Sequence, residues 1–354
     1  MFANITGNQA TKSRLQRMIN SNRVPGALLF AGTQGVGKRL FAIELAKTFN
    51  CLNLTAMGEA CDVCGACRRI ATLVDARERI AASDAAIVWS DHKDVGLIVA
   101  DGRFIKIEQA REIAREANFR PAEGHRRVFI IDDADRLNEA AANALLKTLE
   151  EMPATTYLIL VSSRPDALLP TIRSRCQTLR FAPLAAGEIE SHLIATKQRA
   201  GDEARLTARL ARGNLALAHS FNLDAYQSQR EQILIVLDAL ASKRDRARVL
   251  RIAEEISDPK HKEDFETTLD TFEITVRDVW HLALNAQHDP TNSGTPDIIN
   301  SDIAARLAAL AARLAPHTLA LFLTRIDRVR RELSININRR LATDALLLGI
   351  IAET

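Results

Sequence analysis

The chain has 354 residues, of which 47% are hydrophobic, 26% charged and 5% aromatic, and its formal net charge is +3. This length allows two or three domains with ample cores, and a net charge this small does not by itself indicate binding to nucleic acid or membrane. Because the sequence shows neither an apolar run of about 18 residues nor a signal-peptide pattern at its start, we expect a cytoplasmic protein without membrane contact.

The first half of the chain alternates segments typical of strands and helices. Apolar runs of strand length lie at 27–31, 128–131, 157–161 and 178–181. Helical spacing of apolar residues follows over 40–49 and again from Asn138, a favoured N-cap residue, through Met152. This alternation predicts an α/β core, with a parallel sheet flanked by helices and ligands at the carboxyl ends of its strands.

The strand patterns stop at about Pro183. Residues 184–222 read as small helices, and 223–354 read as longer helices with Ala- and Leu-rich faces, interrupted by a polar loop at 287–300. The sequence therefore predicts three parts: an α/β domain over 1–182, a small helical module over 183–222 and an all-α domain over 223–354.

A glycine-rich loop follows the first predicted strand. Gly32, Gly37 and Lys38 meet the pattern G-x-x-x-x-G-K-[ST], with Gly35 inside it, and such loops bind nucleotide phosphates through backbone N–H groups and the lysine. Arg39 stands where the pattern requires the hydroxyl that ligates Mg²⁺. The sequence thus predicts a nucleotide-binding loop in which metal-assisted hydrolysis is impaired. The alternative is a glycine-rich turn without a ligand.

Two acidic residues end the second predicted strand. Asp132 and Asp133 occupy the place of a Walker B pair, where Asp132 could hold Mg²⁺ through water. Asp133 stands where active relatives usually carry a Glu that polarises the attacking water, and its side chain is one methylene shorter. Without the upstream loop, this pair is equally typical of a turn at a strand end.

Four cysteines lie close together in the sequence. They follow the spacing C-x9-C-x2-C-x2-C and are Cys51, Cys61, Cys64 and Cys67. Four thiolates on tight turns are a common ligand set for structural Zn²⁺, so we predict a zinc knuckle after the first helix. A redox role and unliganded thiols are the alternatives, and cytoplasmic conditions disfavour disulfides. Cys176 is far away in sequence and is expected to be a small buried residue.

Several motifs taken together resemble the clamp-loader subunits of bacterial DNA polymerase III, which are AAA+ proteins. The resemblance is specific over residues 1 to about 220 and loose beyond. It implies an AAA+ module, a helical lid over 183–222 and a collar domain over 223–354 that holds a pentamer together. The segments that carry it are the loop at 32–39, the four cysteines, 130–135, 143–151, 169–176 and Asn338-Arg339-Arg340-Leu341.

The resemblance also implies roles for individual residues. Arg175, in Ser174-Arg175-Cys176, matches the arginine finger that acts in trans on ATP bound by an adjacent motor subunit, although alone it would read as a solvated surface residue. Ser163 or Ser162 would be the sensor at its strand end. The segment that lies against the nucleotide base would contain Ile5, Gly7 and Asn8.

Three positions depart from the pattern of the motor subunits. Arg39 removes the Mg²⁺ hydroxyl, Asp133 replaces the Glu, and Ala216 occupies the place of the lid arginine. We therefore expect a non-motor subunit without independent enzymatic activity, which binds ATP, if at all, without hydrolysis. Its implied partners are tau/gamma-type ATPase and delta subunits in a hetero-pentamer, the sliding clamp and primed DNA.

Two other functions fit the same sequence. One is an active ATPase of the tau/gamma type, and the other is a zinc-containing scaffold that nucleotide only stabilises. Direct contact with DNA is a further hypothesis, because some basic residues could line a path for the duplex, although the usual meaning of such residues is a solvated face. They are Arg68, Arg69, Arg120, Arg126 and Arg127.

Overall fold

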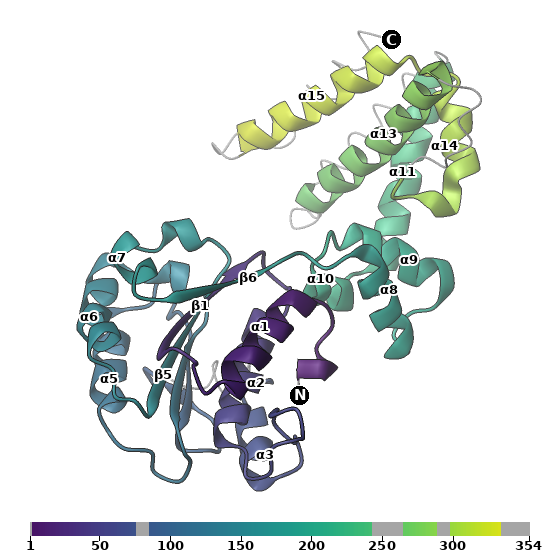
Figure 1. The fold of residues 1–354 in the computed structure, drawn as a ribbon. Helices are drawn as coiled ribbons and strands as arrows, with labels where there is room; N and C mark the ends of the chain where they lie inside the picture. Colours follow the sequence, from purple (N-terminus) through teal and green to yellow (C-terminus); the bar gives the residue numbers. More distant parts are fainter. Residues whose placement is uncertain (1, 76–84, 243–264, 289–297, 334–354) are drawn as a thin grey trace. The chain divides into compact units, whose positions relative to one another are not determined.

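A computed structural model describes residues 2–75, 85–242, 265–288 and 298–333 (Figure 1). The chain divides into two compact units. The first comprises Met1–Gln198 with Ala211–Ser220, and the second comprises Arg199–Leu210 with Phe221–Thr354. The small helices of 183–222 are thus shared between the units, because α8 (Ala186–Ala195) and α10 (Leu215–Ser220) belong to the first and α9 (Gly201–Leu210) to the second.

A six-stranded sheet in the order β2-β3-β4-β5-β1-β6 forms the centre of the first unit (Figure 1). All neighbouring strands pair in parallel except β2 and β3, which are antiparallel. The predicted α/β class is therefore confirmed, with an antiparallel strand added at one edge. The strands are β1 (Ala27–Gly32), β2 (Val88–Trp89), β3 (Val95–Ile98), β4 (Arg127–Ile131), β5 (Thr156–Ser162) and β6 (Gln177–Phe181).

Helices cover both faces of this sheet. Figure 1 shows α1 and α2 on one face and α5 and α6 on the other. The helices and 3-10 turns of the first unit, apart from α8 and α10, are η1 (Phe2–Asn4), α1 (Gln9–Asn20), α2 (Lys38–Asn50), α3 (Gly65–Ala71), α5 (Ile107–Ala117), η2 (Ala134–Arg136), α6 (Glu139–Glu150), η3 (Pro165–Ala167) and α7 (Pro170–Arg173).

The start of α6 agrees with the prediction and its end does not. The Asn138 side chain accepts a hydrogen bond from the N–H of Ala141 at 2.8 Å, which caps the helix. Ala141, Leu145 and Leu149 are buried against the sheet. The helix ends at Glu150, so Met152, the last residue of the predicted helical spacing, lies beyond it, although its side chain still packs against the same core.

Aromatic packing joins the start of the chain to the face of the sheet that α2 covers. Phe41 of α2 stacks on Phe2, with ring centroids 5.8 Å apart, and meets Phe181 of β6 edge-on at 4.9 Å. Phe30 of β1 packs on Phe181 at 5.2 Å. These buried rings fix the N-terminal segment next to the glycine-rich loop that connects β1 to α2.

The second unit is helical in its described part. A buried cluster that includes Leu237, Val276, Leu319 and Phe322 forms its core. The predicted polar loop begins within α13, its residues 289–297 lie outside the described residues, and so does the predicted collar motif at 338–341. The elements besides α9 are α11 (Leu223–Ser242), α13 (Phe265–His288), η5 (Ser301–Ile303), α14 (Ala304–Ala311) and α15 (Pro316–Leu333).

A buried polar cluster ties these helices together around Asn300. The amide oxygen of Asn300 accepts hydrogen bonds from Tyr226 and Arg230, both at 2.8 Å. The backbone N–H and the side-chain amide of Asn300 both donate to Asp278 at 2.8 Å, and Arg230 makes a bidentate pair with Asp302. Because every member has partners, the cluster specifies one packing of the unit.

No single helix in the described ranges is both long and apolar enough to cross a membrane. One bent pair, Ser301–Ala311 with Pro316–Arg331, passes that test of length and composition only when its two helices are taken together.

Candidate nucleotide site, arginine finger and metal cluster

The glycine-rich loop adopts a backbone that only glycine accommodates easily. Gly37 caps α2 with φ 89° and ψ 8°, in the left-handed region. Gly35 has φ +75°, and a Cβ atom on it would lie 1.6 Å from the Oδ1 atom of Asn214. The loop therefore needs glycine at 35 for space as well as for conformation.

Lys38 is folded onto its own loop. Its Nζ atom donates hydrogen bonds to the carbonyl oxygens of Gly32 at 2.7 Å and Thr33 at 2.6 Å, and the residue is buried. Burial lowers the pKa of Lys38, and the nearby carboxylates of Asp132 and Asp133 oppose that shift. The ammonium group is thus placed at the predicted phosphate site with the loop carbonyls as its hydrogen-bond acceptors.

Arg39 and Asp132, which were assigned separately from the sequence, face each other in the structure. The NH1 atom of Arg39 lies 3.4 Å from Oδ2 of Asp132, and its NH2 atom donates to the carbonyl oxygen of Val74. Burial raises the pKa of Asp132, and the Arg39 charge opposes that shift. A fixed cation of the protein thus stands beside the carboxylate that would hold Mg²⁺.

The Asp133 side chain contacts a different arginine from Asp132. Its backbone is left-handed, with φ 48° and ψ 49°, and it caps the short η2 turn. The carboxylate is 48% exposed and lies 4.0 Å from the Arg136 guanidinium. The structure therefore places Asp133 next to the site, with its carboxylate at ion-pair distance from Arg136.

The predicted sensor serines converge on a carboxylate that the sequence analysis did not single out. The Ser162 hydroxyl and the Ser163 N–H both donate to Oδ1 of Asp135, at 2.8 and 3.2 Å. Arg164 donates to Oδ2 through Nε at 3.1 Å and NH2 at 3.0 Å. Burial would raise the pKa of Asp135, but these donors, led by Ser162, hold it below its ordinary value.

The start of α10 rests on the glycine-rich loop. The N–H of Ala216 donates to the carbonyl oxygen of Gly35 at 3.3 Å. The Oδ1 atom of Asn214, which abuts Gly35, accepts the N–H of Leu217 at 2.9 Å. The predicted lid position of Ala216 is therefore at the loop, although its methyl side chain brings no charge to it.

The predicted base-binding segment also borders this loop. The Cγ2 atom of Ile5 would lie 3.6 Å from a Cβ atom on Gly37. Asn8 forms two hydrogen bonds with the backbone of Ala182, at 3.2 and 2.8 Å. The structure thus brings together in one unit the glycine-rich loop, the acidic pair, the end of β5 predicted to carry the sensor, the predicted base-binding segment and the start of α10.

Arg175 follows α7, and its side chain is 35% exposed. Its Nε atom donates to Oε1 of Glu150 at 2.7 Å, its NH2 group pairs with the same carboxylate, and NH1 donates to the carbonyl oxygen of Thr171 at 3.0 Å. The contact with Glu150 is not predicted by the sequence motif around Arg175. The available signal was an acidic residue at a helix C-terminus, where the helix dipole disfavours negative charge.

The four predicted cysteine ligands lie in one cluster. Their sulfur atoms are all within 4.8 Å of one another, and those of Cys51 and Cys64 are 3.9 Å apart. Thiolates at the usual Zn–S distance of about 2.3 Å in a tetrahedron stand about 3.8 Å apart. These side chains could therefore hold a metal ion. The cluster begins at the end of α2 and finishes in α3.

Backbone donors and burial act on these thiols in opposite directions. Burial alone would raise the pKa of Cys64, but N–H donors, led by that of Cys67, lower it to about 6. Burial raises the pKa of Cys51 and of Cys67. At neutral pH the cluster thus provides a thiolate, which is the form that binds metal. Cys176 is buried as predicted, and burial raises its pKa to about 12.

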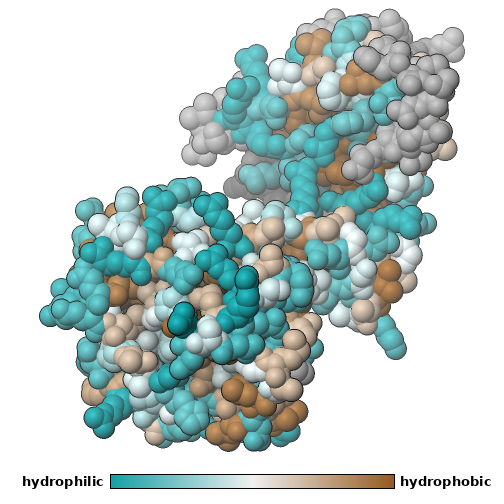
Figure 2. Space-filling view, in the orientation of Figure 1, coloured by the Kyte–Doolittle hydropathy of each residue, from teal (hydrophilic) through white to brown (hydrophobic). Residues whose placement is uncertain are grey.

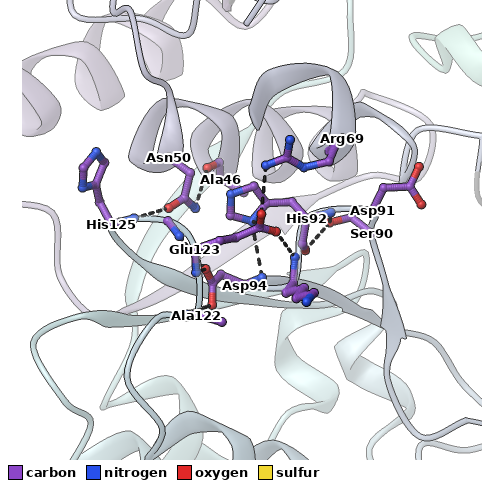
Figure 3. Close-up of polar contacts among 12 residues, drawn as sticks. Ala46, Asn50, Arg69, Ser90, Asp91, His92, Asp94, Ala122, Glu123 and His125 are labelled. Carbon is purple, nitrogen blue, oxygen red and sulfur yellow. Dashed lines mark hydrogen bonds and ion pairs between the residues drawn. The ribbon is translucent and has the colours of Figure 1, made fainter. Parts of the chain in front are cut away.

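A polar network fastens the cysteine module to the sheet (Figure 3). Arg69 of α3 pairs with Glu123 at 3.0 Å. Asp94 accepts the three consecutive N–H groups of residues 122–124 at 2.7 to 2.9 Å. Asn50, at the end of α2, accepts those of His125 and Arg126. The loop that precedes β4 is therefore tied to α2, α3 and the start of β3.

The prediction that Arg127 could contact DNA or lie on a solvated face is wrong. Arg127 is buried, its guanidinium pairs with Glu116 at 2.8 Å, and it lies over the ring of Trp89 at 5.4 Å. It can therefore line no exposed path, nor is it part of a solvated face. Of the other candidates, Arg68, Arg69 and Arg120 are exposed and Arg126 is partly buried.

The cysteine module also exposes large apolar side chains. Figure 2 shows a brown patch at the lower edge of the first unit, in the region where Figure 1 labels α3. The exposed hydrophobic residues of this module are Leu52 (65%), Leu54 (51%), Met57 (63%) and Val63 (66%).

Comparisons with known proteins identify relatives of the chain. A profile of the family described as DNA polymerase III, delta subunit, matches residues 7–185. DNA polymerase III subunit delta′ of Bacillus subtilis is 31% identical over 270 residues, 76% of each chain. Subunit tau of Salmonella typhimurium is 29% identical over 376 residues, which cover 99% of this chain and 54% of that protein. A DNA polymerase III gamma subunit-related protein of Thermotoga maritima superimposes with a TM-score of 0.37 at 18% identity, covering 96% of this chain and 98% of that one.

Proposed function

Because this chain belongs to the DNA polymerase III delta-subunit family, we propose that it is the delta-prime, non-motor subunit of a bacterial clamp loader. In this role it places Arg175 at ATP bound by an adjacent tau/gamma-type subunit while the sliding clamp is loaded onto primed DNA. Clamp loading belongs to chromosomal replication, so the chain acts in the cytoplasm as part of the polymerase holoenzyme and has no catalytic activity alone.

One observation carries the proposal: the Arg39 guanidinium lies 3.4 Å from Asp132. In a hydrolysing site, Mg²⁺ bridges the β- and γ-phosphates and is held by the loop hydroxyl and the Walker B acid. Here a permanently charged arginine faces that acid, and a metal ion would have to compete with it. This arrangement supports a subunit that does not hydrolyse ATP itself.

The exposed arginine supports the other half of the proposal. An arginine finger is worth about 10³–10⁵ in hydrolysis rate, which corresponds to about 4–7 kcal/mol of transition-state stabilisation. Arg175 is accessible at the surface of its unit and is held by contacts to Glu150 and Thr171. It is thus available to a second chain, whereas Lys38 and Arg39 are engaged within their own site.

The proposed cofactors belong to the cysteine cluster and to the glycine-rich loop. We assign Zn²⁺ to the four thiols, where it would staple the segment between α2 and α3 and leave no open position for catalysis. ATP, if bound at the glycine-rich loop, would be stabilising and remain intact. The delta subunit and the ATPase subunits would complete a hetero-pentamer through the collar domain. This chain spans 54% of the tau protein that it resembles, so these partners belong to the proposal.

A reconstituted complex tests the finger. We expect Arg175→Ala to lower ATP turnover stimulated by clamp and primed DNA by about 10³–10⁵-fold at a site that depends fully on the finger. Arg173→Ala is the matched control, because Arg173 lies two residues away and pairs with Asp166 at 2.6 Å. Unchanged turnover and clamp loading with Arg175→Ala would refute the assignment.

The two alternatives make different predictions in the same preparation. An active tau/gamma-type ATPase predicts Mg²⁺-dependent hydrolysis by the isolated chain that Lys38→Ala abolishes, and the Arg39–Asp132 contact argues against it. A zinc-containing scaffold predicts that the chain enters no complex with ATPase and delta subunits, while ATP still raises its melting temperature.

A further inference from the structure

The carboxylate of Glu150 is the acceptor for the arginine on which the proposed function rests. We propose that Glu150 is a positioning residue, which holds the Arg175 guanidinium between rounds of hydrolysis and releases it to the γ-phosphate of the neighbouring subunit's ATP. This inference depends on the finger role of Arg175, and it assigns a residue that controls when the finger is available.

The contacts define a single resting position for the guanidinium. Nε and NH2 of Arg175 both address Oε1 of Glu150, and NH1 donates to the carbonyl oxygen of Thr171 at 3.0 Å. All three nitrogens therefore have acceptors, which come from the end of α6 and from α7. A phosphate oxygen would use the same donors, so the carboxylate and the phosphate compete for one group.

The position of Glu150 in its helix gives it a reason to need a cation. It is the last residue of α6, and Glu151 follows it directly. A helix C-terminus carries a partial negative charge, so two carboxylates there are unfavourable unless a cation is near. Lys147 lies in the same last turn, and Arg175, from 25 residues further along the chain, adds a cation that pairs directly with Glu150. The pair is thus built by the tertiary fold.

The exposure of the pair suits exchange rather than permanent fixation. Arg175 and Glu150 are 35% and 48% exposed, whereas Arg127 and Glu116, which form a structural pair in the same unit, are 7% and 19% exposed. Exposed ion pairs hold their partners only weakly, by a factor of about two to five. Arginine binds phosphate in a bidentate manner, and a terminal phosphate carries more negative charge than a carboxylate. The γ-phosphate can therefore take the guanidinium from Glu150.

A charge-neutral variant tests the inference in the reconstituted complex. Glu150→Gln keeps the shape of the side chain and removes the competing charge. We expect kcat/KM for ATP to rise about two- to fivefold, mainly through a lower KM, with kcat little changed. Glu151→Gln is the matched control, since it makes the same charge change at the same helix end and no described hydrogen bond or ion pair joins Glu151 to Arg175.

A double variant separates this role from simple helix capping. In an Arg175→Ala background, Glu150→Gln should change nothing further, because no finger remains to be released. If the role of Glu150 were purely structural, Glu150→Gln would instead lower the melting temperature and leave KM unchanged. An unchanged KM, an equal effect of Glu151→Gln, or a gain that persists without Arg175 would each overturn the inference. If Arg175→Ala itself has no effect, the finger assignment fails as well.

Discussion

Arg39 and Asp132 meet 3.4 Å apart beside the glycine-rich loop, one at the start of α2 and the other directly after β4. The two residues are 93 positions apart in sequence and carry opposite charges. They meet where P-loop proteins that hydrolyse nucleotide hold Mg²⁺. Arginine cannot be deprotonated near neutral pH, so Arg39 keeps its charge under all physiological conditions.

The first prediction concerns the metal dependence of nucleotide binding. For the wild-type chain we expect the same ATP affinity in Mg²⁺ and in EDTA, because Arg39 already faces Asp132. Arg39→Thr restores the hydroxyl and frees the carboxylate, so it should bind ATP at least about tenfold more tightly with Mg²⁺ than without, a difference of about 1.4 kcal/mol. Isothermal titration measures both. Arg39→Lys retains a cation and should show no Mg²⁺ effect, and a wild-type chain that prefers Mg²⁺–ATP contradicts the prediction.

The second prediction concerns the space at Gly35. Gly35→Ala should lower the free energy of unfolding by about 2–4 kcal/mol, which combines left-handed strain with a clash against Asn214. Adding Asn214→Ala to the Gly35→Ala chain should remove the clash, and so recover the part of the free energy of unfolding that the clash costs, while the backbone strain remains. Gly102→Ala isolates the strain, because Gly102 has φ +66° and nothing within 4 Å of its added Cβ. Urea unfolding provides the values, and strict additivity of the two substitutions would contradict the contact.

The third prediction concerns the cysteine cluster. Purified protein should contain one equivalent of zinc, and Cys61→Ser should reduce that content to near zero and lower the melting temperature, since binding a structural metal contributes directly to folding. Cys176→Ser is the control, because Cys176 is buried away from the cluster and should leave the metal content unchanged. Four freely titratable thiols in metal-free protein of undiminished stability would exclude the site.

The fourth prediction concerns pH and Asp94. Burial would raise the pKa of this carboxyl, but the N–H groups of residues 122–124 lower it below its ordinary value. A depressed pKa stabilises the fold above the unfolded-state value of about 3.9, and that contribution is lost as the pH falls through the folded-state pKa. Asp94→Asn should therefore cost about 2–3 kcal/mol at pH 7, and the difference from wild type should shrink towards pH 3. A pH-independent difference in urea unfolding would contradict this.

The fifth prediction concerns the second unit. Asn300 is fully buried and serves Tyr226, Arg230 and Asp278 at once. Asn300→Ala should lower the stability of this unit by about 3 kcal/mol, because it leaves buried donors and acceptors without partners. Ser301→Ala, at the exposed neighbouring position, should have little effect. Hydrogen exchange in α11 and α13 reports on this unit alone, and equal protection in the two variants would count against the cluster.

The sequence predicted the central strands and the glycine-rich loop because their signals are local. The strands β1, β4 and β5 are runs of consecutive buried residues, which is the pattern of a parallel sheet buried on both faces. The strands β2 and β3 have two and four residues, too few for any periodicity. Pairing with β4 makes β3 a strand, and pairing with β3 makes β2 one, and that information is not local.

The site residues divide in the same way. The cysteine spacing and the loop motif predicted their clusters because the members of each are close in sequence, within residues 51–67 for the cysteines and 32–39 for the loop. The Arg175–Glu150 contact and the collection of donors around Asp135 depend on segments brought together by the sheet. Arg127 reads as basic and solvated in the sequence, and only packing against Trp89 and Glu116 reveals a buried ion pair.

The carboxylate of Asp135 organises the hydrogen-bond donors at the end of β5. The Ser162 hydroxyl, the Ser163 N–H and two nitrogens of Arg164 already donate to it. A phosphate entering the loop would have to compete with a buried carboxylate for these four donors. The anion that organises the end of β5 therefore belongs to the protein itself, and it fixes the Ser162–Arg164 segment whether or not the loop holds a ligand.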